Sequence, residues 1–75
     1  MSHLGRILEA IISYEKAIQY EPANSSAWSN RGNLLSDLER EEEAISSYEN
    51  AITHQLNKVQ AWDGLGASLY KLGQY

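Results

Sequence analysis

The side chains that could do chemistry are few, and none of them has the neighbours that chemistry requires. The two histidines, His3 and His54, have no carboxylate or second histidine at the spacing that metal ligands take on a helix. The serines have no histidine base paired with an acidic residue to orient it, so a serine nucleophile is not expected. With no cysteine in the chain, a disulfide framework, a zinc knuckle and a cysteine nucleophile are excluded. The residues therefore predict a protein that is not an enzyme and holds no metal.

Two short motifs have a functional and an ordinary interpretation. Gly64-Leu65-Gly66 is similar to the start of a dinucleotide-binding fingerprint, but it lacks a preceding strand and a third small residue, so no cofactor is predicted. The acidic run from Glu39 to Glu43 could be a docking patch for a basic partner. We favour a solvated helix start, because carboxylates are stabilised by the dipole at a helix N-terminus.

Composition and charge narrow the class further. The 75 residues allow one small domain, and their six basic and ten acidic residues give a net charge of −4. The basic residues are scattered singly, which argues against nucleic acid as a partner. The longest apolar run, Ala10-Ile11-Ile12, is too short to span a membrane, and the first residues lack the apolar core of a signal peptide. We expect a cytoplasmic protein with no membrane partner.

The elements that must position these residues are set by an internal repeat. When the chain is shifted by 34 residues, the segment from Glu9 to Ile18 falls on the segment from Glu43 to Ile52 with eight of ten residues identical. The same shift places Ala27-Trp28 on Ala61-Trp62. A fixed period of this length is the signature of a repeat protein.

Each half of the period has the apolar spacing of an amphipathic helix. The pattern predicts four helices and no strand, over Ile7 to Tyr20, Ser26 to Asp37, Glu41 to His54 and Val59 to Leu72. Pro22 should end the first helix, and Asn24 or Ser25 should cap the second. Gly73 is expected to end the fourth in the left-handed conformation. Short connections between helices of similar length indicate antiparallel hairpins.

Small and large side chains recur at fixed places in the period. The small residues should let helix backbones approach closely where two helices cross, and the aromatic residues should fill the adjoining space. The residues that we expect to define the packing of the repeats are Trp28, Gly32, Leu35, Ala44, Tyr48, Ala51, Trp62, Gly66, Ala10, Tyr14 and Ala17. A single hairpin cannot cover its own apolar face and must stack on a neighbour.

Residues at these places resemble the tetratricopeptide repeat (TPR) family. Trp28-x-x-Arg31-Gly32-x-x-Leu35 followed by Ala44-x-x-x-Tyr48-x-x-Ala51 looks like one complete repeat. The resemblance implies an all-α fold of antiparallel helix-turn-helix repeats stacked as a right-handed solenoid of four helices. It divides the chain into the second helix of a partial repeat (1–24), a complete repeat (25–58) and the first helix of another partial repeat (59–75). The chain then resembles a segment of a longer, bacterial-type array.

The resemblance also implies a site. In this family the first helix of each repeat lines a concave groove that accepts an extended peptide or a partner helix. Carried over position by position, the groove residues are Ser26, Ser29, Asn30, Asn33, Ser36, Asp37, Gln60, Asp63, Gly64, Ala67, Tyr70 and Lys71. The set of amides and basic residues with which some members grip a C-terminal carboxylate is incomplete, so a neutral or mildly basic segment is the better ligand.

The implied function is a non-catalytic scaffold module that binds protein or peptide. The alternative is a structural spacer between other domains, with no ligand of its own. Three departures from the family pattern bear on packing: Arg31 places a charge at an inner position, Glu39 stands where the flanking copies have glycine, and Leu56 replaces Pro22. Turns without their usual breaker residue are prone to domain swapping. We therefore expect self-association at high concentration, by end-to-end stacking or by a swap that opens at Glu39-Arg40 or Leu56-Lys58.

Overall fold

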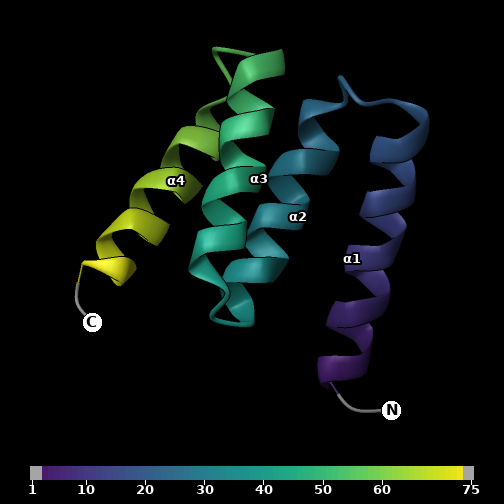
Figure 1. Cartoon of the computed structure of the whole chain (residues 1–75), viewed down its shortest axis with the longest axis horizontal. Coiled ribbons are helices and arrows are strands. Elements are labelled where there is room, and N and C mark those ends of the chain that lie inside the picture. The colour runs from purple at the N-terminus through teal and green to yellow at the C-terminus, as the bar shows by residue number, and fades with distance from the viewer. Residues whose placement is uncertain (1–2, 74–75) are drawn as a thin grey trace.

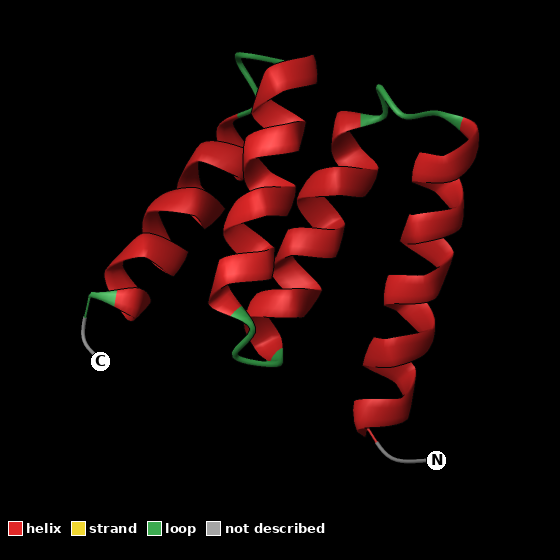
Figure 2. Cartoon of the chain, viewed as in Figure 1, coloured by secondary structure: helices red, strands yellow, loops and turns green. Residues whose placement is uncertain are grey.

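Four helices lie side by side in chain order in the computed structural model, which describes residues 3–73 (Figure 1). They are α1 (His3–Tyr20), α2 (Ser25–Asp37), α3 (Glu41–His54) and α4 (Val59–Leu72). The described residues contain helices and turns and no strand (Figure 2). The helices form a slab of 33 × 32 × 15 Å, with α1 and α4 at its opposite ends. The predicted all-α architecture of antiparallel helical hairpins is confirmed.

The helix boundaries follow from local chemistry, with two corrections. Asn24 caps α2, as predicted, by accepting a hydrogen bond from the Ala27 N–H at 3.1 Å. Helix α1 begins at His3 and not at Ile7, so Leu4, Gly5 and Arg6 are helical. Gly73 has φ −68°, so the prediction of a left-handed residue at this position is wrong.

The turn between α2 and α3 does contain a left-handed residue. Glu39 has φ 61°, and it is the one residue other than glycine with positive φ in the described chain. Its N–H donates to the Ser36 carbonyl and the Arg40 N–H donates to the Leu35 carbonyl, both at 2.9 Å. These two bonds form a Schellman motif, in which glycine is the preferred left-handed residue. Glu39 thus takes a conformation that is unfavourable for a residue with a Cβ atom.

The turn between α1 and α2 and the turn between α3 and α4 are held in the same way despite different sequences. The indole N–H of Trp28 donates to the carbonyl of Pro22 at 2.8 Å. The indole N–H of Trp62 donates to the carbonyl of Leu56 at 2.7 Å. Helix α3 ends at His54, and Gln55 is extended, so the loss of proline at position 56 does not extend the helix.

The core lies between α2 and α3, which make the most extensive helix–helix contact. Its buried members are Ile11, Leu35, Ala44, Tyr48, Ala51 and Ala61. Helix α1 contacts α2 alone among the described helices, and α4 contacts α3 and α2. The packing residues of the outer helices are consequently more exposed: Ala10, Tyr14 and Ala17 are half-buried, and Trp62 and Gly66 are exposed. Ile11 of α1 is nevertheless buried against the core.

Candidate functional site

The ring of Tyr48 is the structural centre of the site. Helix α3 inserts this side chain between α2 and α4, where it is 2% exposed. A Cβ atom added at Gly32 would lie 2.7 Å from the Tyr48 ring, and one added at Gly64 would also overlap the ring. Gly32 therefore makes room for the Tyr48 ring, a role that the sequence does not predict for it. Gly64, absent from the predicted packing set, has the same role.

The hydroxyl of Tyr48 fixes an amide at the surface. It donates a hydrogen bond to Oδ1 of Asn33 at 2.6 Å. Burial, with the nearby carboxylates of Asp37 and Glu41 acting in the same direction, raises the pKa of Tyr48 to about 12. The hydroxyl is therefore a proton donor throughout the neutral range. With its oxygen engaged by Tyr48, the Asn33 amide keeps its two N–H donors for other partners.

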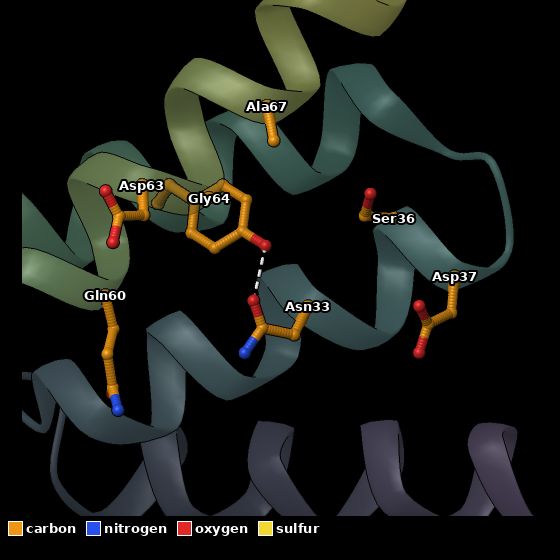
Figure 3. Close-up of a pocket in the computed structure, with 8 residues that line it drawn as sticks. Asn33, Ser36, Asp37, Gln60, Asp63, Gly64 and Ala67 are labelled. Atoms are coloured by element: carbon orange, nitrogen blue, oxygen red, sulfur yellow. Dashed lines mark hydrogen bonds between the residues drawn. The ribbon is translucent and has the colours of Figure 1, made fainter.

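Next to this pair the surface is hollowed between α2 and α4. The hollow has a volume of about 480 Å³. It is lined by Asn33, Ser36, Asp37, Tyr48, Gln60, Asp63, Gly64 and Ala67 (Figure 3). Its charged groups are two carboxylates, Asp37 from α2 and Asp63 from α4, and its uncharged polar groups include the amides of Asn33 and Gln60. The arrangement can accept hydrogen bonds from a cation and can pair with a peptide backbone.

The other predicted groove residues lie outside this hollow. Lys71 reaches its edge, because its ammonium donates to Ser36 Oγ at 3.2 Å. Ser26 is exposed and accepts a hydrogen bond from Lys58 at 2.9 Å. Asn30 is half-buried and Tyr70 is exposed, and neither lines the hollow. Ser29 is 1% exposed, so the expectation that it faces a ligand is corrected: its side chain is inside the protein.

Two charged residues near the site have specific partners. Arg31 pairs with Glu15 at 3.1 Å and donates to Ser47, so the charge at this inner position is paired. Glu41 is 5% exposed and accepts a hydrogen bond from Ser36 Oγ at 2.8 Å. The interpretation of the acidic run as a solvated helix start is therefore wrong for Glu41. The sequence offers no signal that separates Glu41 from its acidic neighbours, because the pairing depends on how α3 returns along α2.

No group of three or more histidine, aspartate or glutamate side chains lies close enough together in residues 3–73 to hold a metal ion. Within the same range, none of the helices has the length and apolar character needed to cross a membrane.

Part of the chain is also similar in sequence to a known protein family. The family model described as the tetratricopeptide repeat matches residues 13–46, from the second half of α1 through α2 into α3. A comparison with curated proteins found no match to the chain. Proteins of this family are generally non-catalytic modules that bind other proteins. The matched segment, the internal 34-residue period and the four antiparallel helices agree, and together they support a fragment of the tetratricopeptide repeat family.

Proposed function

We propose that this chain is an interaction module that binds an extended peptide segment with basic side chains, in the hollow between α2 and α4. The observation that carries the proposal is the composition of the hollow. It gathers two carboxylates, Asp37 and Asp63, with two amides, Asn33 and Gln60, from consecutive first helices of the repeats. Amides suit the backbone of an extended chain, and the carboxylates suit lysine or arginine.

Two features make the hollow selective. The Asn33 amide is held by the buried Tyr48 hydroxyl, so little side-chain freedom is lost when a ligand binds to it. Lys71, at the edge of the hollow, donates to the neutral Ser36 hydroxyl, so the two carboxylates outnumber the ammonium group beside them. An acidic segment would therefore meet two carboxylates with little compensation, whereas a basic segment would be attracted. Both the cytoplasmic location and the repeat boundaries expected from the sequence remain predictions.

The binding test uses blocked peptides, because the proposal does not depend on a free C-terminus. Acetylated and amidated peptides that alternate alanine with lysine should bind in a fluorescence anisotropy titration, and matched alanine–glutamate peptides should not. Replacing both carboxylates (Asp37→Asn with Asp63→Asn) should weaken lysine-peptide binding by about tenfold. The control pair, Glu9→Gln with Glu49→Gln, changes the net charge equally at exposed positions outside the hollow and should leave binding unchanged.

A second pair of variants tests the position of the site. Asn33→Ala should weaken binding because Asn33 lines the hollow, whereas Asn30→Ala should not. Circular dichroism checks that both variants keep their helicity. Equal losses in the two charge pairs would mean that peptides are attracted by net charge alone. Binding of neither peptide would favour the structural spacer.

A further inference from the structure

The end helices α1 and α4 each have a face that no described helix covers. By position in the repeat, these two faces are equivalent to the faces of α3 and α2 that pack against each other in the core. By the 34-residue period, α4 is equivalent to α2, and α1 is equivalent to α3. Leu69 of α4 is 53% exposed, whereas its equivalent Leu35 is 1% exposed. On α1, Ser13 is exposed, and Tyr14 is half-buried, whereas their equivalents on α3 are buried.

Gly66 shows most directly what is missing on α4. At its equivalent, Gly32, an added Cβ atom would meet the Tyr48 ring, but at Gly66 nothing lies within 4 Å. Gly66 is thus a helical glycine with the space for an aromatic ring and with no ring in that space. The side chain equivalent to Tyr48 on the other end of the molecule is Tyr14, which no described helix covers in the way that α2 covers Tyr48.

Two residues that form a polar pair between α2 and α3 are both replaced by largely apolar residues on the uncovered faces of α4 and α1, which indicates that these two faces are complementary. Between α2 and α3, Ser36 donates a hydrogen bond to the buried Glu41. The equivalent residues on the uncovered faces are Tyr70 and Ile7, so both members of the polar pair are replaced by side chains with large apolar surfaces. Tyr70 is 70% exposed in the single chain. Replacing one member alone would leave a buried polar group without a partner.

We propose that α4 of one copy docks on α1 of a second copy in the arrangement that α2 and α3 have within the chain. The Tyr14 ring of the second copy then occupies the space over Gly66, as Tyr48 does over Gly32. Leu69 and Tyr70 of the first copy become covered. The contact joins two different faces, so each added copy presents the same pair of faces again, and the assembly grows in a line without closing. This inference is independent of the proposed peptide site.

Sedimentation of the full chain from micromolar to millimolar concentration tests the docking. The weight-average mass should rise past that of a dimer. Gly66→Leu fills the space over α4 without touching anything in the single chain, so it should keep the fold and weaken association by about 30-fold or more. Tyr14→Ala should weaken it similarly from the other face. The controls are Thr53→Leu and Tyr20→Ala, which change exposed side chains away from both faces and should associate as the original chain does.

A mixture of the two interface variants gives the decisive result. The Gly66→Leu chain keeps an intact α1 face, and the Tyr14→Ala chain keeps an intact α4 face, so the mixture should form a one-to-one dimer and nothing larger. Circular dichroism of each variant distinguishes lost docking from lost folding. The proposal is overturned by a chain that stays monomeric at millimolar concentration, by an assembly that stops at a dimer, as a domain swap would, or by variants that do not complement each other.

Discussion

The space around Tyr48 allows a quantitative comparison of two glycines that look alike in the sequence. Gly32 and Gly66 are equivalent in the repeat, and both lie inside helices. Alanine is favoured over glycine in a helix interior by about 1 kcal/mol, and this gain applies to both positions. At Gly32 the added methyl would lie 2.7 Å from a ring that is confined on its other side by Gly64. Overpacking of this kind lowers the free energy of unfolding by about 1–3 kcal/mol.

We therefore expect Gly66→Ala to stabilise the chain by about 1 kcal/mol, and Gly32→Ala to be less stable than Gly66→Ala by about 1–3 kcal/mol. In a domain of this size, each kcal/mol corresponds to about 4–8 °C in Tm. Urea and thermal unfolding followed by circular dichroism at low micromolar concentration, where docking between copies is negligible, measure both. In a Tyr48→Leu background the ring is absent, and Gly32→Ala should become stabilising. Equal effects of the two alanines in the original chain would refute the role assigned to the ring.

Two further predictions follow from single residues. Because the folded pKa of Tyr48 is raised to about 12 from 10.0, the folded state holds its proton more tightly than the unfolded state, so the free energy of unfolding should fall between about pH 10 and pH 12 by about 1–3 kcal/mol. Tyr48→Phe should lose that part of the alkaline slope in urea titrations, and a persistent slope would contradict the assignment. Glu39→Gly should raise the free energy of unfolding by about 1 kcal/mol, because Glu39 has φ 61°, whereas Glu42→Gly, inside α3, should lower it by a similar amount. A loss of stability on Glu39→Gly would argue against the left-handed turn.

The repeat allowed most of the fold to be predicted. The apolar spacing and the period give α2, α3 and α4 nearly to the residue, because caps, breakers and periodicity agree at those places. The start of α1 could not be predicted. Leu4-Gly5-Arg6 is equivalent in the repeat to the turn at Leu38-Glu39-Arg40, yet it is helical in α1, so position in the repeat alone does not give the start of this helix.

The site was less predictable than the fold. The family resemblance implies Asn33, Asp37, Gln60 and Asp63 as groove positions, and all four line the hollow between α2 and α4. It does not identify Ser29 as buried or Glu41 as paired, because both depend on how deeply neighbouring helices pack. The sequence places Gly64 in a Gly-x-Gly motif and the family resemblance places it in the groove, whereas its contact with Tyr48 depends on the side chain of another helix.

The tryptophan contacts at the α1–α2 and α3–α4 turns affect which changes of sequence these turns can tolerate. Each turn is held by a hydrogen bond from an indole N–H on the helix that follows it. The acceptor is a backbone carbonyl, which every amino acid possesses. The identity of the residue that offers this carbonyl is then nearly immaterial to the path of the chain, as Pro22 and Leu56 illustrate. Mutations can accumulate in these turns without altering how successive hairpins are oriented, provided that Trp28 and Trp62 are retained.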